Sequence, residues 1–224
     1  MNKNTSRPLF LLPLLLLFNL RLVSALNLNA MSSVDFIPSP SPGSQPLTNG
    51  SDFIRSSCKC TTYSDLCYDT LKPYSRSVNG DLAKLSIVAI GVSLEKVKTM
   101  ASYLANLSRD ADHKYDPRMA QSLQLCLDLI GGDDGAVDDI QRSLKQMREL
   151  GAAGSSKERL RYLLFNVENW ITGASINHSG CQDSFDDVAD GPLKEDVIAR
   201  AEYVKKFTTI ALGLVECYSD KVTS

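Results

Sequence analysis

The sequence is poor in histidine, the commonest metal ligand and a frequent acid–base catalyst. Its 224 residues include two histidines, His113 and His178, and both lie far from the cysteine cluster at residues 58–67. A zinc site would need further His or Cys ligands at paired spacing. A Gly-x-Ser-x-Gly elbow, a phosphate-binding loop and a His-Glu-x-x-His motif are also missing. We therefore expect no metal, no cofactor and no catalytic residue. An enzyme built on paired carboxylates is the alternative from a different class.

Long apolar runs are missing after the first 20 residues. Lys3 and Arg7 precede an apolar run at residues 9–18, and the small residues Val23-Ser24-Ala25 follow it. This order is typical of a cleaved secretory signal peptide. The run is too short to span a bilayer, so a signal anchor is the weaker alternative. We predict a signal peptide at residues 1–25 and a secreted chain that does not bind membranes.

An excess of positive charge is missing as well. Residues 1–25 hold three basic residues and no acidic one, so their removal changes the formal net charge from −2 to −5. A mildly acidic protein is a poor ligand for nucleic acid. Residues 26–50 are rich in Pro and Ser and predict a disordered linker. Residues 51–220 are long enough for one domain with a hydrophobic core.

What the domain does contain is helical periodicity. Apolar residues recur every three or four positions, which places them on one buried face of a helix, and no comparable run alternates with period two. These stripes run from Ala83 to Leu104, Met119 to Ile130, Val137 to Met147, Leu160 to Ala174 and Leu193 to Val215. We predict an all-α fold, an up-and-down four-helix bundle at residues 79–220, with a coiled-coil dimer as the rival.

Helix boundaries are marked by local signals. Asp116-Pro117, the serines at 155–156 and Gly191-Pro192 are typical of helix starts. Three glycines within residues 131–135 predict a kink or break between two stripes. Residues 51–78 hold few apolar side chains, so we expect a short helical hairpin there that needs a covalent bond to stay closed.

Six cysteines in an exported chain favour disulfides over zinc or dithiol redox chemistry. Within the hairpin, either Cys58 or Cys60 can pair with Cys67, and the spacing does not choose between them. Cys126 lies on a buried stripe and Cys181 follows the next long helix. A bridge between these two is favoured over two buried free thiols.

Three segments together resemble the family of plant invertase and pectin methylesterase inhibitors. They are FIRSSCKCTTYSDLC at residues 53–67, NVENWITGA at residues 166–174 and FTTIALGL at residues 207–214. The resemblance implies a four-helix bundle preceded by a disulfide-closed helical hairpin. It also implies pairing of neighbouring cysteines, Cys58 with Cys67 and Cys126 with Cys181. Cys60 and Cys217 remain as free thiols or as a third bridge.

The resemblance implies a non-enzymatic inhibitor in the plant apoplast or cell wall. The Pro-Lys-Phe tripeptide common in invertase inhibitors is missing. The expected function is therefore inhibition of pectin methylesterase by a monomer that covers the substrate cleft in a 1:1 complex. Inhibition of acid invertase is the alternative, and a secreted helical module without an enzyme target is a second one.

The resemblance also suggests where a partner would bind. Family members usually carry Thr before the fourth disulfide cysteine, facing the target enzyme, whereas this chain has Gly180. Asp183 follows it in an acidic cluster with residues 186, 187 and 190, and a second cluster lies at residues 133–139. We take Gly180 and Asp183 as candidate partner contacts, while solvated surface is the plainer interpretation of both clusters. Both histidines are expected to be solvated.

Three glycosylation sequons lie beyond the predicted signal peptide. They begin at Asn49, Asn106 and Asn177. A glycan on Asn177 would crowd the proposed contact region near Gly180, so its occupancy would count against a binding face there.

Overall fold

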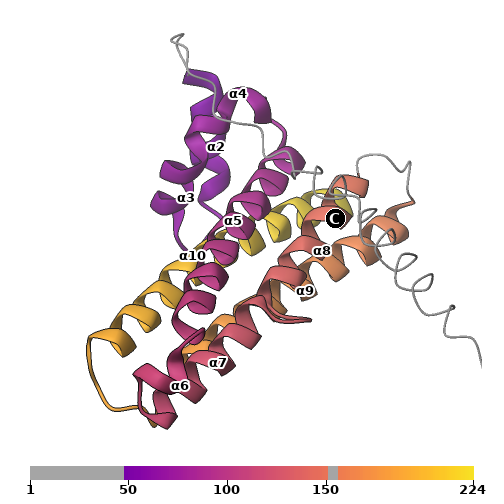
Figure 1. Cartoon of the computed structure of the whole chain (residues 1–224). Helices are drawn as coiled ribbons and strands as arrows, with labels where there is room; N and C mark the ends of the chain where they lie inside the picture. Colours follow the sequence, from indigo (N-terminus) through magenta and orange to yellow (C-terminus); the bar gives the residue numbers. More distant parts are fainter. Residues whose placement is uncertain (1–47, 151–155) are drawn as a thin grey trace, which may run out of the picture. The chain divides into compact units, whose positions relative to one another are not determined.

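Helices form the regular structure of the residues that the computed structural model describes, 48–150 and 156–224, and no strand occurs among them (Figure 1). A helical hairpin comes first, and longer helices follow. The predicted signal peptide and residues 26–47 of the predicted linker lie outside the described residues. The elements are α2 (Thr48–Cys58), α3 (Ser64–Leu71), the short 3-10 helix η2 (Lys72–Tyr74), α4 (Ser75–Val78), α5 (Leu82–Ser108), α6 (Ala111–Lys114), α7 (Pro117–Gly131), α8 (Ala136–Leu150), α9 (Lys157–Asp183) and α10 (Pro192–Thr223).

The bundle has four arms, and one of them consists of two helices. α9 packs against α10, α8 and α7, while α5 packs against α10, α7 and α8. α7 and α8 follow one another along the same side of the bundle and together form one arm (Figure 1). The other three arms are α5, α9 and α10. The predicted all-α four-helix bundle is confirmed. Among the helices described, none is both long and apolar enough to cross a membrane.

The break between α7 and α8 falls at the predicted glycines. The Gly132 N–H still donates to the Asp128 carbonyl, but a Cβ on Gly132 would lie 2.5 Å from that same oxygen. Asp134 then adopts a left-handed conformation with φ of 57°. A side chain at residue 132 could not be accommodated without moving the backbone, so glycine is required there for the chain to leave α7 and start α8.

Caps fix the start of two bundle helices. The Asp116 carboxylate accepts hydrogen bonds from the backbone N–H groups of Arg118 (3.0 Å) and Met119 (3.2 Å), with Pro117 at the first helical position of α7. The Ser156 hydroxyl accepts from the Arg159 N–H at 3.3 Å at the start of α9. These contacts satisfy amide groups that have no partner within the helix, as the sequence signals predict.

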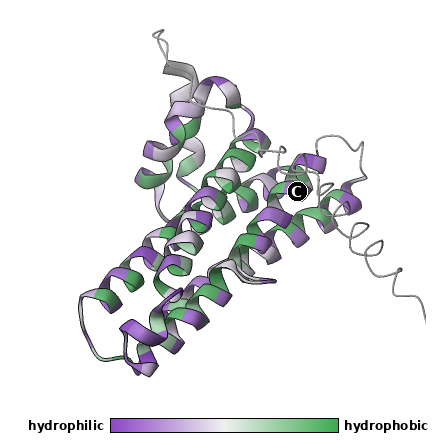
Figure 2. Ribbon diagram, viewed as in Figure 1, coloured by the Kyte–Doolittle hydropathy of each residue, from purple (hydrophilic) through white to green (hydrophobic). Residues whose placement is uncertain are grey.

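The predicted apolar stripes form the core. Figure 2 shows the apolar residues as green bands along the helices, with purple polar residues on the remaining surface. Residues from each bundle arm are fully buried, for example Leu85, Ile90, Leu123, Ile140, Leu164 and Leu214. Each such side chain, when fully buried, stabilises the folded protein by about 1.5–3 kcal/mol relative to leaving it exposed to water.

Three disulfides staple these elements, and no described cysteine is free. Cys58–Cys67 closes the hairpin between α2 and α3, and Cys126–Cys181 joins α7 to α9. The third bridge joins Cys60, in the turn after α2, to Cys217 on α10, with the two Cα atoms 6.6 Å apart. Both leftover cysteines of the sequence analysis are thus used, and Cys67 pairs with Cys58 rather than with Cys60.

Candidate functional site

The chain turns from α9 to α10 at residues 184–191, and this turn is anchored to the bundle by its own side chains. Phe185 is fully buried and Val188 is 5% exposed. The Ser184 hydroxyl donates to the Cys181 carbonyl at 2.7 Å and so satisfies a carbonyl in the last turn of α9. Because a buried aromatic ring and a buried valine hold it, the turn presents a fixed surface.

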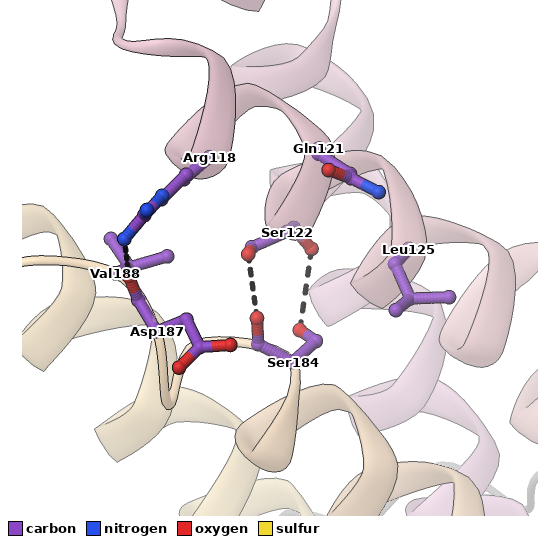
Figure 3. Close-up of a pocket in the computed structure, with 7 residues that line it drawn as sticks. All are labelled: Arg118, Gln121, Ser122, Leu125, Ser184, Asp187 and Val188. Carbon is purple, nitrogen blue, oxygen red and sulfur yellow. Dashed lines mark hydrogen bonds between the residues drawn. The ribbon is translucent and has the colours of Figure 1, made fainter.

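A pocket of about 450 Å³ lies between this turn and α7 (Figure 3). The Ser122 hydroxyl donates to the Ser184 carbonyl at 2.5 Å across its floor, and the Ser184 hydroxyl lies 3.4 Å from the Ser122 carbonyl. At the rim, Arg118 donates to the Asp187 carbonyl at 3.4 Å. Gln121, Leu125 and Val188 complete the lining. The polar groups of Ser122 and Ser184 in the floor bind one another, and none of the described residues that line the pocket is a histidine or cysteine.

A second pocket, of about 430 Å³, lies on the other side of α7. The two pockets share Gln121 and Leu125, which form a ridge between them. Leu125 is 48% exposed and is the large apolar residue on this ridge. An exposed leucine flanked by two depressions is suited to contact with another protein surface, because both raised and hollow features can be matched.

Gly180 and Asp183 lie beside this ridge, at the end of α9. A Cβ on Gly180 would lie 3.2 Å from Leu129 Cδ1 of α7, so the glycine allows α9 and α7 to approach closely next to the Cys126–Cys181 bridge. Asp183 is exposed. Both candidate contacts therefore lie in the last turn of α9, which packs against α7, the helix that carries Gln121 and Leu125.

The two acidic clusters differ in how their charge is balanced. In the first, Arg142 contacts Asp134 and Asp138 by hydrogen bonds and lies 3.8 Å from Asp139, which is 9% exposed. Burial raises the pKa of the Asp139 carboxyl, and Arg142 opposes that shift. This cluster is an ion-pair network at the start of α8, in which one arginine is shared by three carboxylates and balances only part of their charge.

The second cluster is more open. Asp183, Asp186 and Asp187 are exposed, and no ion pair to any of them occurs within the described part of the chain. Asp190 is the exception, because Lys194 contacts it at 3.1 Å. The turn between α9 and α10 therefore presents three carboxylates to solvent next to the ridge on α7.

His178 is buried, which contradicts the expectation of a solvated ring. It is 0% exposed, and its Nε2 lies 3.4 Å from the Thr208 hydroxyl, which in turn lies 3.1 Å from the Ser93 hydroxyl. Its Nδ1 has no partner among the described residues. Burial lowers the pKa of His178 to about 4, and the nearby Lys205 ammonium adds to the shift. The polar residues on either side in the sequence misled the prediction, because they lie on other faces of the same helix.

The family follows from comparison with known proteins. Residues 52–214 match the family described as "Plant invertase/pectin methylesterase inhibitor". The chain belongs to this family. A curated relative, "Pectinesterase inhibitor 9" of Arabidopsis thaliana, is 27% identical over 205 residues, or 89% of this chain and 93% of the relative. "Pectinesterase inhibitor 3" of the same plant is 30% identical over 164 residues, or 73% of this chain and 78% of the relative.

A solved structure agrees in fold. The crystal structure of a mutant form of a pectin methylesterase inhibitor from Arabidopsis has a TM-score of 0.55 to this chain, at 13% sequence identity. The aligned region covers 73% of this chain and 95% of the chain of the solved structure. At this identity the likeness supports the helical fold, and the family assignment rests on the sequence matches.

For this member of the inhibitor family, sequence reasoning missed the ridge on α7. Leu125 falls outside the stripe of residues 119, 123, 126 and 130, and this departure is the signal that could have marked it as exposed. No group of three or more His, Cys, Asp or Glu side chains within residues 48–150 and 156–224 could hold a metal ion.

The sequons differ in their surroundings. Asn106 is exposed in the last turn of α5 and accepts a hydrogen bond from Arg109 at 3.2 Å. Asn177 is half-buried, and the sequon hydroxyl of Ser179 accepts from Lys205 at 2.7 Å. The side chain of Asn49 lies outside what the structure describes.

Proposed function

We propose that this protein inhibits pectin methylesterase by binding the enzyme without covalent chemistry, in a 1:1 complex that excludes the substrate from its cleft. The observation that carries the proposal is the match to relatives named pectinesterase inhibitors over 73–89% of the chain. The missing Pro-Lys-Phe tripeptide favours an esterase target over an invertase. On this proposal the protein is a secreted monomer of the apoplast and not an enzyme.

The ridge on α7 and the turn from α9 to α10 are the proposed contact face. An inhibitor that acts by occlusion needs a surface that does not yield when it binds, since ordering a mobile surface costs affinity. This face has the Cys126–Cys181 bridge beneath it and Phe185 buried in its turn. A standard interface buries about 1,600 Å² in total, so α7 would contribute alongside neighbouring helices. Leu125 would lie near its centre, with Asp183 and Asp187 at the rim.

The decisive experiment titrates the purified protein against plant pectin methylesterase and, separately, against acid invertase. Loss of esterase activity that is linear in inhibitor and complete at one equivalent supports the proposal. Loss of invertase activity instead would assign the other branch of the family. If both enzymes keep full activity in a saturating excess of the protein, the proposal is wrong, and a helical interaction module without an enzyme target is the remaining alternative.

The contact face has its own test. Replacing the exposed Leu125 by Lys should weaken esterase inhibition at least 10-fold, because a charge would replace the apolar residue at the centre of the interface. The matched control is Tyr162→Lys, since Tyr162 is 64% exposed near the start of α9, far along the helix from Gly180. Equal inhibition by both variants and the parent would remove the ridge from the interface.

A further inference from the structure

The three disulfides differ in how far solvent can reach them. The four cysteines of the two bridges within the hairpin and between α7 and α9 are at most 1% exposed. In the third bridge, Cys60 is exposed and Cys217 is half-buried. Thiol–disulfide exchange requires direct attack of a thiolate on one sulfur, so access decides which bridge reacts first. A reductant in solution therefore meets one bridge of the three.

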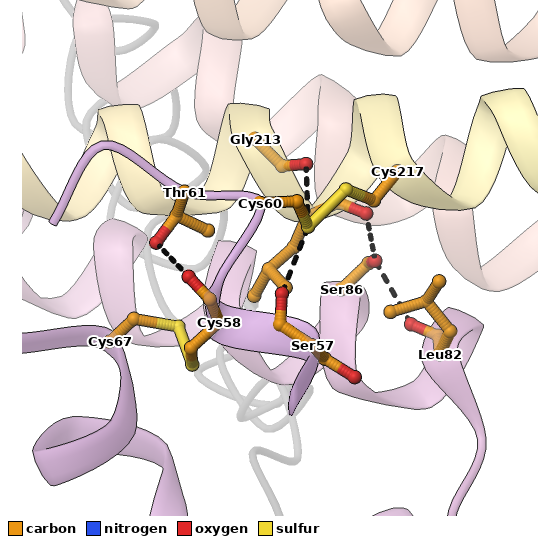
Figure 4. The surroundings of a disulfide bond; sticks show 10 residues. Ser57, Cys58, Cys60, Thr61, Cys67, Leu82, Ser86, Gly213 and Cys217 are labelled. Atoms are coloured by element: carbon orange, nitrogen blue, oxygen red, sulfur yellow. Dashed lines mark hydrogen bonds between the residues drawn. A yellow bond between two sulfur atoms is a disulfide. The ribbon is translucent and has the colours of Figure 1, made fainter. Parts of the chain in front are cut away.

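This accessible bridge fastens the turn between α2 and α3 to the last helix (Figure 4). The turn already lies directly on α10: a Cβ on Gly213 would be 3.3 Å from the Cys60 carbonyl oxygen and 3.3 Å from Thr61 Cα. Thr61 is 7% exposed, and its hydroxyl donates to the Cys58 carbonyl at 2.9 Å. Cys217 lies one helical turn beyond Gly213, on the same face of α10. The bridge thus holds together two segments that already touch.

Besides the packing of α2 and α3 against α10 and of α3 against α5, the hairpin has one other covalent connection to the bundle, at its opposite end. There the chain passes from α4 to α5 through Asn79 and Gly80, both with positive φ, at 49° and 73°. The hairpin also has its own staple, Cys58–Cys67, which keeps α2 and α3 together whatever happens to the third bridge. The chain connection at residues 79–80 and the accessible disulfide therefore lie at opposite ends of the hairpin. The connection could act as a hinge, and the Cys60–Cys217 bridge, called the clasp below, would hold the other end against α10.

We propose that Cys60–Cys217 is a redox clasp that a dithiol reductant opens before the other two bridges, releasing the hairpin to move about residues 79–80. In the first step a reductant thiolate attacks Cys60 Sγ, a mixed disulfide forms, and Cys217 leaves as a thiolate that takes a proton from water. In the second step the other thiol of the reductant attacks the mixed disulfide and releases Cys60 as a thiol. The two electrons come from the dithiol, which ends as a disulfide.

The order of opening is measured by stepwise reduction. The oxidised full-length mature protein is equilibrated with increasing dithiothreitol, trapped with iodoacetamide and mapped by peptide mass spectrometry. We expect residues 60 and 217 to be alkylated together, at a reductant concentration at least 10-fold below that needed for the other four cysteines. Alkylation of residues 58 and 67 or of 126 and 181 at the same or lower concentration would overturn the proposal. So would free thiols at residues 60 and 217 before any reductant is added.

The release of the hairpin is measured by amide hydrogen exchange. Amides of α2, α3 and α4 should exchange at least 10-fold faster in the partly reduced, alkylated protein than in the oxidised protein, while amides of α5 and α9 stay unchanged as an internal control. The double variant Cys60→Ser/Cys217→Ser should reproduce this pattern without a bulky alkyl group. Unchanged exchange of the hairpin in the partly reduced protein would show that the bridge is not a clasp. Neither measurement depends on the identity of the target enzyme.

Discussion

At the scale of single residues, the buried His178 links the stability of the fold to pH. The ring is fully buried between the bundle helices, with Thr208 as its polar contact, and burial away from bulk solvent disfavours a positive charge on it. Its pKa of about 4 in the folded protein lies below the ordinary value of 6.5. The unfolded chain therefore takes up a proton at a higher pH than the folded chain does.

The sign of the pH effect follows from that difference. Above pH 6.5 both states are neutral at His178, and between 6.5 and 4 the unfolded state is protonated first, so the free energy of unfolding falls as the pH drops. The loss from this one residue amounts to about 3 kcal/mol at pH 4. We predict that in His178→Gln the free energy of unfolding falls by about 3 kcal/mol less between pH 7 and pH 4 than it does in the parent protein. Urea denaturation of both proteins from pH 4 to 7 measures it, and parallel curves would contradict it.

Two glycines of α9 provide a matched pair. A Cβ on Gly180 would meet the flexible end of the half-buried Leu129 at 3.2 Å, whereas a Cβ on Gly173 would meet Asp139 Oδ2 at 2.8 Å. Ala is favoured over Gly within a helix by about 1 kcal/mol. We predict that Gly180→Ala raises the free energy of unfolding by up to that amount, because Leu129 can move away.

The same substitution at Gly173 should have the opposite sign. Asp139 is held in place by burial and by Arg142, so the added methyl group would displace a carboxylate from its ion-pair network. We expect Gly173→Ala to lower the free energy of unfolding by about 1–2 kcal/mol, within the range of other overpacked sites. Both variants are compared by urea denaturation at pH 7, and a stabilised Gly173→Ala protein would refute this account of the site.

At the scale of the elements, the sequence predicts what depends on local chemistry. The cap at Asp116, the break at residues 131–135 and the buried stripes are set by the preferences of neighbouring residues, and all are present in the structure. The Cys60–Cys217 bridge joins residues 157 positions apart, and no local pattern indicates that the hairpin turn lies against α10. For the ridge, the position of Leu125 outside the apolar stripe indicates exposure, but the two depressions that flank it depend on how the α9–α10 turn and α6 pack beside α7.

The contact between the hairpin turn and α10 depends on Gly213. Its missing side chain lets the backbone of Cys60 and Thr61 approach so closely that an added Cβ, at 3.3 Å, would push the turn away by a few tenths of an ångström. We predict that Gly213→Val lowers the free energy of unfolding by about 1–3 kcal/mol, because a turn backbone cannot rotate away as a side chain end can. In the Gly213→Val protein, amide hydrogen exchange in α2 and α3 should be faster than in the parent protein, while exchange in α9 should stay unchanged. Gly213→Ala, with a smaller side chain, is expected to have a weaker effect in the same direction.

At the scale of the whole molecule, the distribution of charge bears on how a partner would be recruited. The chain carries a formal net charge of −2, or −5 without residues 1–25. Three carboxylates at residues 134–139 share Arg142, whereas the exposed carboxylates of Asp183, Asp186 and Asp187 near the ridge have no ion pair among the described residues. A basic enzyme surface would be attracted to this end of the bundle, and association would be faster at low salt.

This attraction can be separated from the general negative charge of the protein. We predict that the triple variant Asp183→Asn/Asp186→Asn/Asp187→Asn slows association with a basic pectin methylesterase and reduces the dependence of the rate on salt. A control with the same change in charge is Asp52→Asn/Asp65→Asn/Asp69→Asn, which removes three exposed carboxylates from the hairpin. Surface plasmon resonance at several salt concentrations measures both effects. Equal rates for the two triple variants would mean that the turn between α9 and α10 plays no special part in recruiting the enzyme.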